Sequence, residues 1–186
     1  MKPLVFIFCI FFCYSCEEIH VPKPKAFLNL DYPKASYLKS QLDVPFEFEK
    51  NKLAQLNISK KNNIIKGILL RYPTLKASVF INYKKIDDNL EKLISDARSM
   101  TKKHLQMADE ISERMYENPQ QNLYGMFYDL KGDIASQSQF FVTDSTRHFI
   151  SGALYFETKP NYDSILPAIK YIQKDLMHFI ESLRWK

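Results

Sequence analysis

The chain is poor in cysteine and glycine, and it has one long apolar run. Three cysteines and four glycines occur in 186 residues. Cys9 and Cys13 lie in the apolar first segment, so the rest of the chain keeps a single thiol, Cys16, with no partner for a disulfide. The few glycines form no phosphate-binding loop, which argues against a nucleotide enzyme. No later run approaches the roughly 20 apolar residues that a transmembrane helix needs.

The first segment has the composition of a cleavable leader. Met1 and Lys2 give the N-terminus a positive charge, and the unbroken apolar run Leu4–Phe12 follows. This run is too short to span a bilayer. Ser15 directly precedes Cys16, and bacterial lipoproteins present the thiol that receives a diacylglyceryl group in this way. Cys13 departs from the pattern, because such boxes usually hold an aliphatic residue there; the alternative is an ordinary secretory leader. We expect a signal peptide over residues 1–15 and a covalent lipid on Cys16.

The rest of the chain predicts a tether and a single domain. Residues 16–25 contain Pro22 and Pro24 and too few apolar residues to pack, which indicates a flexible tether. Residues 26–186 have the length of one domain, which can bury roughly 70% of its unfolded surface without metal or disulfide. The net charge of +5 is spread over both signs. A nucleic-acid-binding surface needs a clustered basic patch, so we expect no nucleic-acid partner.

Periodicity in the first half predicts strands and then a helix. Irregular chain and short strands are expected before Pro45. Phe46–Glu49 and Leu75–Tyr83 alternate between apolar and other residues, and the continuous apolar run Ile64–Tyr72 predicts a further strand. After Asp88, which we expect to form a capping box with Glu91, apolar residues recur at helical spacing as far as Ala108. His104 falls on the apolar face of this predicted helix, where a packed core residue is expected.

The second half predicts a sheet and a terminal helix. Ile111–Tyr116 fits either a strand or an extension of the helix, and we favour a strand. Turn residues separate three further predicted strands, which form an antiparallel meander over Leu123–Leu130, Ala135–Thr143 and Arg147–Phe156. An amphipathic helix follows from Ile165 to Leu183, with Pro167 expected in its first turn. The expected fold is α+β, an antiparallel β-sheet covered by two long amphipathic helices.

Few residues gather into a pattern that supports catalysis. Asp144, Ser145 and His148 form the single local grouping of acid, nucleophile and base, but they fall in a predicted turn without a Gly-x-Ser-x-Gly elbow. A hydrolase therefore stays a minor alternative, and we expect a protein without enzymatic activity. The histidines are isolated from one another, so no zinc site is expected. They are His20, His104, His148 and His178.

The predicted strand over Ala135–Thr143 carries polar side chains on both faces. Ser136 and Ser138 share one face, and Gln137 and Gln139 share the other. If this strand is central, the amides and hydroxyls must be satisfied by each other or by a ligand. The alternative is an edge strand that faces water. The candidate interaction residues are Ser136, Gln137 and Gln139, together with Arg147 and Tyr155 of the next strand.

The mature chain also carries a series of short motifs in a definite order. They are Val21-Pro22-Lys23-Pro24-Lys25, Asp31-Tyr32-Pro33, Pro45-Phe46-Glu47-Phe48-Glu49, Tyr124-Gly125-Met126-Phe127-Tyr128, Ala135-Ser136-Gln137 with Gln139-Phe140, Thr143-Asp144-Ser145-Thr146, Pro160-Asn161-Tyr162-Asp163-Ser164-Ile165-Leu166-Pro167 and Leu183-Arg184-Trp185-Lys186. Through these motifs the chain from Cys16 onward resembles the gliding-motility lipoprotein GldD family of the Bacteroidetes. The resemblance covers nearly the whole mature chain.

This resemblance implies a cell-envelope lipoprotein needed for surface gliding and for the associated type IX secretion machinery. It implies no known catalysis, and Cys16, carrying acyl chains such as palmitate, is the one functional residue that it transfers. The expected partners are the membrane and other envelope proteins of the gliding and secretion apparatus. We favour the outer over the inner membrane, with the domain outside the cytoplasm. A looser similarity in element order links the chain to the Mog1 and PsbP-like proteins. The alternative function is an envelope ligand-binding module that uses the Gln137 and Gln139 strand.

Overall fold

The computed structural model describes residues 31–61, 64–103, 107–157 and 161–186. The predicted signal peptide, Cys16, the tether and His104 lie outside these ranges, so the expectations for them concern residues that the structure does not describe. Among the described residues, no helix has the length and apolar character required to cross a membrane.

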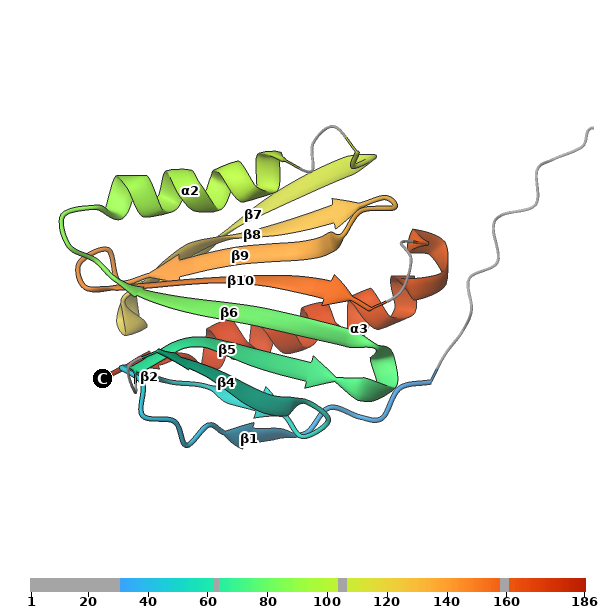
Figure 1. The fold of residues 1–186 in the computed structure, drawn as a ribbon, viewed down its shortest axis with the longest axis horizontal. Coiled ribbons are helices and arrows are strands. Elements are labelled where there is room, and N and C mark those ends of the chain that lie inside the picture. Colours follow the sequence, from blue (N-terminus) through green and yellow to red (C-terminus); the bar gives the residue numbers. More distant parts are fainter. Residues whose placement is uncertain (1–30, 62–63, 104–106, 158–160) are drawn as a thin grey trace, which may run out of the picture.

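A seven-stranded antiparallel sheet forms the centre of the described domain (Figure 1). Its strand order is β4-β5-β6-β10-β9-β8-β7. The strands are β4 (Gln55–Lys61), β5 (Ile64–Tyr72), β6 (Ala77–Lys85), β7 (Glu110–Asn118), β8 (Leu123–Lys131), β9 (Ser136–Thr143) and β10 (His148–Phe156). The chain forms two meanders, β4 to β6 and β7 to β10, which become one sheet because β6 pairs with β10. Short 3-10 turns at Pro73–Leu75 and Pro119–Gln121 connect neighbouring strands.

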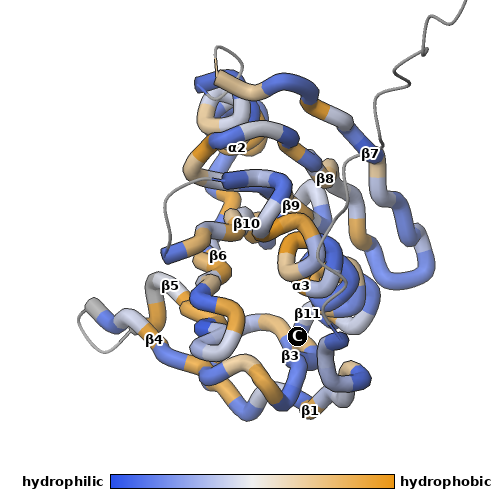
Figure 2. The backbone as a smooth tube through the Cα atoms, turned by 90° about the vertical axis from the view of Figure 1, so that its right-hand side faces the viewer, coloured by the Kyte–Doolittle hydropathy of each residue, from blue (hydrophilic) through white to orange (hydrophobic). Residues whose placement is uncertain are grey.

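The two long helices pack on opposite faces of the sheet. They are α2 (Leu90–Lys102) and α3 (Tyr162–Ser182). Successive residues of a strand point to opposite faces, and Phe140 accordingly packs with Phe179 of α3, whereas Phe141 packs in a second cluster with Leu93 of α2. The larger core lies between the sheet and α3 (Figure 2). Helix α2 contacts β9 and β10, and on the same face Phe80 of β6 stays 46% exposed.

Two short sheets close the domain beside α3. Strand β1 (Tyr37–Lys39) pairs with β3 (Glu49–Asn51), and β2 (Phe46–Glu47) pairs with β11 (Arg184–Trp185). Phe46 and Phe48 are buried while Glu47 is exposed, so the alternation predicted over Phe46–Glu49 is confirmed. The prediction of one continuous strand is wrong, because this segment divides between two small sheets.

The large antiparallel sheet and the α+β class are confirmed, including the strand around Ile111–Tyr116. Strand β4 was not predicted. The capping box is wrong, since Asp88 has φ +49° and α2 begins after Asn89 without a side-chain cap. Helix α2 ends at Lys102, before the predicted end. Pro167 lies inside α3, which begins at Tyr162, and therefore occupies the second turn instead of the first.

Candidate interaction surface

Strand β9 lies in the interior of the sheet, between β8 and β10. All residues from Ser136 to Thr143 are buried. The alternative of an edge strand facing water is therefore wrong. A buried polar side chain stabilises the fold only where it is hydrogen-bonded, so the partners of these side chains decide whether the strand has binding capacity left.

The two glutamines of β9 are partly satisfied, and Gln139 points toward α2. Gln139 Oε1 accepts a hydrogen bond from Thr101 Oγ1 at 2.9 Å, and Gln137 Nε2 donates to the Ile134 carbonyl at 2.6 Å. Gln139 Nε2 and Gln137 Oε1 have no partner among the described residues. The cavity beside Gln139, which Ser151 also lines, has a volume of about 20 Å³. It has room for roughly one water molecule, and a glycan or peptide does not fit.

Ser138 of β9 faces α3, whereas Ser136 lies beyond a β-bulge that shifts the register between β9 and β10. Ser138 Oγ accepts a hydrogen bond from Gln173 Nε2 at 3.0 Å, and Ser136 Oγ donates to the Ser138 carbonyl at 3.4 Å. Gln173 also donates to Asp129 Oδ1 at 2.7 Å. The polar residues of β9 thus link the sheet to both helices, and most of their hydrogen-bonding capacity is used within the fold.

The other two candidate interaction residues, Tyr155 and Arg147, lie on different parts of the domain. Tyr155 lies opposite Ser136 in the strand register, and its ring packs edge-on against Phe80 with the centroids 5.6 Å apart. Arg147 instead lies in the exposed turn before β10. Tyr155 therefore adjoins the polar strand, whereas Arg147 belongs to a different surface.

The grouping of Asp144, Ser145 and His148 forms a turn. Asp144 Oδ1 accepts hydrogen bonds from the backbone N–H groups of Thr146, Arg147 and His148 at 3.0, 2.8 and 2.7 Å. Partial burial opposes ionisation of Asp144, but these donors outweigh it and lower the pKa of the carboxyl. The Asp144 carboxylate is thus engaged by backbone groups of its own turn.

The imidazole of His148 is held by aromatic residues. His148 Nδ1 lies 2.9 Å from the Tyr83 hydroxyl, and the ring stacks on Trp185 with centroids 5.1 Å apart. Burial lowers the pKa of His148, and the charges of Arg147 and Lys85 lower it further, against the opposing effect of Asp144. His148 Nε2 is buried without a partner in the described part of the chain. These contacts describe a packed, neutral histidine, and they do not assemble a nucleophile, base and acid.

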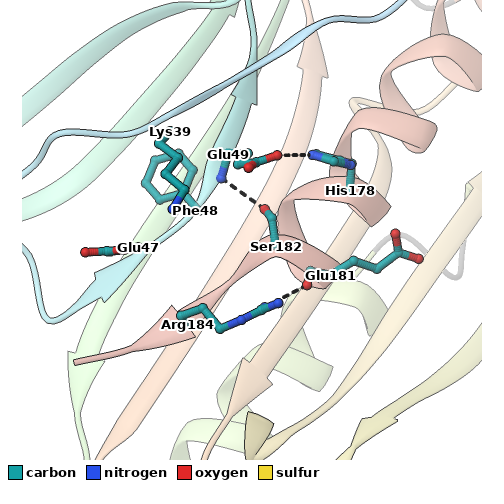
Figure 3. A pocket seen from close by; sticks show the side chains of 8 residues that line it. All are labelled: Lys39, Glu47, Phe48, Glu49, His178, Glu181, Ser182 and Arg184. Carbon is teal, nitrogen blue, oxygen red and sulfur yellow. Dashed lines mark hydrogen bonds and ion pairs between the residues drawn. The ribbon is translucent and has the colours of Figure 1, made fainter. Parts of the chain in front are cut away.

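Two adjoining grooves lie where the chain ends, and both are lined by Arg184. The first, which we call the helix-end groove, has a volume of about 380 Å³ (Figure 3). Its lining residues are Lys39, Glu47, Phe48, Glu49, His178, Glu181, Ser182 and Arg184. The second, the terminal groove, has a volume of about 600 Å³. Its lining residues are Gln120, Gln121, Asn122, Asp144, Thr146, Arg147, Arg184, Trp185 and Lys186.

The walls of the helix-end groove are held together by contacts between β3 and α3 (Figure 3). His178 Nε2 lies 2.8 Å from Glu49 Oε2, and the Glu49 backbone N–H donates to Ser182 Oγ at 3.0 Å. The ring of Tyr37 stacks on His178 with centroids 3.5 Å apart. Glu49 and His178 in this wall therefore satisfy one another.

The terminal groove is built from three segments that are far apart in the sequence. Trp185 Nε1 donates to the Asn122 carbonyl at 3.0 Å, and Arg184 Nη1 donates to Gln121 Oε1 at 2.7 Å. The Lys186 backbone N–H donates to the Pro45 carbonyl at 3.0 Å. Sequence reasoning missed this groove. The available signals were the lone tryptophan at the C-terminal end and the Thr143–Thr146 turn.

Comparison with known proteins gives one family. The model of the family described as "Gliding motility lipoprotein GldD" matches residues 17–185. A search of curated proteins finds no match. The matched range contains β9 and the residues of both grooves except Lys186.

Proposed function

The chain belongs to the gliding motility lipoprotein GldD family, and from this premise we propose that it is a non-enzymatic accessory component of the gliding apparatus and its associated type IX secretion machinery. A lipid on Cys16 tethers it to an envelope membrane, the outer in preference to the inner, after removal of residues 1–15. The domain acts by binding other envelope proteins. The sheet with helices on opposite faces supports the likeness to Mog1 and PsbP-like proteins, though fold alone carries no function.

The position of the two grooves carries this proposal. The first described segment of the chain lies at one end of the domain, and the C-terminus lies at the opposite end (Figure 1). The residues of the terminal groove include Lys186, so this groove lies at the end away from the first described segment. The predicted tether, residues 16–25, precedes this first described segment in the sequence, so the opposite end stays available to a protein partner.

The state of the polar groups supports binding over catalysis. Asp144 is occupied by backbone N–H donors and His148 is packed between aromatic groups. Glu49 is paired with His178. Groups that general acid–base catalysis would use are thus held by contacts within the fold, and a binding surface needs such rigid walls with polar groups at defined positions.

The alternative of a ligand-binding module at Gln137 and Gln139 rests on two unpartnered amide atoms, Gln137 Oε1 and Gln139 Nε2. Because the adjacent cavity has a volume of about 20 Å³, a ligand larger than water requires displacement of α2. A thermal-shift screen with envelope glycans and peptides tests this alternative, because a ligand that binds the folded state raises the melting temperature.

The function is tested by complementing a deletion strain with the intact gene or with a Cys16→Ser variant. We expect the intact gene to restore both colony spreading and secretion of a type IX cargo, whereas Cys16→Ser restores neither at equal protein abundance, because the domain no longer stays at the membrane. Cys13→Ser is the matched control and should behave as the intact gene. Full restoration by Cys16→Ser would show that anchoring is dispensable, and failure of the intact gene would contradict the motility role.

A further inference from the structure

The cationic side chains of the terminal groove retain unused donors. Arg147 is exposed, and its guanidinium makes no hydrogen bond within the described residues. Arg184 uses Nη1 for its contacts with Gln121 and nearby carbonyl groups, and its Nη2 makes no hydrogen bond with the part of the chain that the structure describes. Lys186 Nζ lies 4.0 Å from Glu47 Oε1, at the limit of an ion pair, and 3.5 Å from the Leu42 carbonyl.

The carboxylate that lines the terminal groove already has hydrogen-bond partners within the fold. Asp144 is the carboxylate among the lining residues, and three backbone N–H groups of its own turn hold it. Gln120, Gln121 and Asn122 add polar but neutral groups. Among the side chains that line the groove, three cations thus accompany one carboxylate that is satisfied locally, and this favours an anionic ligand.

A fixed aromatic wall adds apolar contact to this charge. Trp185 is half-buried, stacks on His148 and donates to the Asn122 carbonyl, so its ring has little freedom left to lose on binding. Tryptophan and arginine are the residue types that contribute most binding energy in protein interfaces. A groove of about 600 Å³ has room for a few residues of polypeptide.

We propose that the terminal groove binds an acidic segment of another envelope protein. Carboxylates of that segment accept hydrogen bonds from Arg147, Arg184 and Lys186, and an apolar side chain packs on Trp185. This inference rests on the proposed function, which places the domain among envelope proteins. The groove lies at the C-terminal end of the domain, opposite the first described segment (Figure 1), and this location favours a protein partner over the headgroups of the anchoring membrane.

The test measures binding of a fluorescent peptide of alternating glutamate and serine, with one central leucine to pack on Trp185, to the purified mature chain by anisotropy. In the groove variant, Arg147→Glu and Lys186→Glu are combined; both side chains are exposed. The control variant combines Lys92→Glu and Lys174→Glu, which are exposed on α2 and α3 and make the same change in net charge. We expect the groove variant to bind about tenfold more weakly, since it replaces two ion pairs with repulsion. The control should bind like the wild type.

Four results would overturn this inference. The first is absence of binding of the acidic peptide, and the second is equal weakening of its binding in both variants. The third is equal affinity for a peptide in which lysine replaces each glutamate. The fourth is groove-dependent binding of anionic phospholipid vesicles without binding of the acidic peptide. The last result would assign the groove to lipid headgroups. Because the Cys16→Ser complementation tests motility without reference to the groove, absence of peptide binding would refute the groove inference and leave the motility role standing.

Discussion

At the scale of single residues, Gly125 in β8 shows how closely two strands of this sheet approach. A Cβ atom built at this position would collide with the Phe141 carbonyl oxygen, and it would lie 2.9 Å from Val142 Cγ1. Both neighbours belong to β9, which pairs directly with β8. No rotation of a flexible side chain relieves a contact with backbone, so the strand itself would have to move.

We therefore expect Gly125→Ala to lower the free energy of unfolding by about 1–3 kcal/mol, the usual cost of overpacking a well-packed site. Urea unfolding of the purified domain measures this change. Gly67→Ala in β5 is the matched control, because its nearest neighbour is Asn82 Oδ1 at 3.5 Å, an ordinary contact. Equal effects of the two substitutions would contradict the packing at Gly125.

At the scale of secondary-structure elements, the buried hydrogen bond between Thr101 and Gln139 connects the end of α2 to the middle of the sheet. Thr101 is 4% exposed and Gln139 is 5% exposed. Removal of one partner leaves the other without its hydrogen bond in a site that excludes bulk water, whereas removal of both leaves an apolar contact.

Thr101→Val should therefore lower the free energy of unfolding by about 1–3 kcal/mol, and Gln139→Met in the same chain should recover part of the loss. Urea unfolding of the single and double variants gives the coupling energy, and amide hydrogen exchange shows whether the last turn of α2 opens first. Ser99→Ala, at an exposed position two residues earlier, serves as the control. Simple additivity of Thr101→Val and Gln139→Met would refute the coupling between helix and sheet.

At the scale of the whole molecule, two buried groups give opposite contributions to the pH dependence of stability. Burial raises the pKa of Asp175, although hydrogen bonds from Tyr37 and Asn51 oppose the effect. The contribution of Asp175 to the stability of the fold is therefore present at acidic pH and is lost as the pH rises. Burial lowers the pKa of His148 below its ordinary value of 6.5. The unfolded chain therefore takes up this proton first, and stability falls as the pH drops below 6.5.

We expect the wild type to lose more stability than a His148→Phe variant between about pH 7 and about pH 5. Phenylalanine keeps an aromatic ring against Trp185 but cannot take up a proton. Loss of the contact with the Tyr83 hydroxyl changes the free energy of unfolding of the variant by the same amount at each pH, so it does not change the slope. The contribution of Asp175 is the same in both proteins. Urea unfolding over a pH series measures the slopes, and parallel curves would show that His148 titrates alike in the folded and unfolded states.

Much of the fold follows from local patterns. The alternation along Leu75–Tyr83 and the helical spacing within α3 predict elements because side-chain direction repeats with a fixed period along the backbone. Strand β4 was missed since its sequence, Gln-Leu-Asn-Ile-Ser-Lys-Lys, has few apolar residues. The capping box failed because Asp88 adopts a positive φ, a backbone choice that the spacing of Asp88 and Glu91 does not reveal.

The sequence by itself determined the leader pattern, the position of Cys16, most strands and helices, and the two polar faces of β9, since each depends on residues that are neighbours along the chain. Only the tertiary structure decided that β9 is interior, that β6 joins β10, and that β11 pairs with β2. It also brought Gln121, Arg147 and Trp185 to one groove. Contacts between distant residues depend on strand pairing and on burial of a shared core, and local periodicity does not encode these distances.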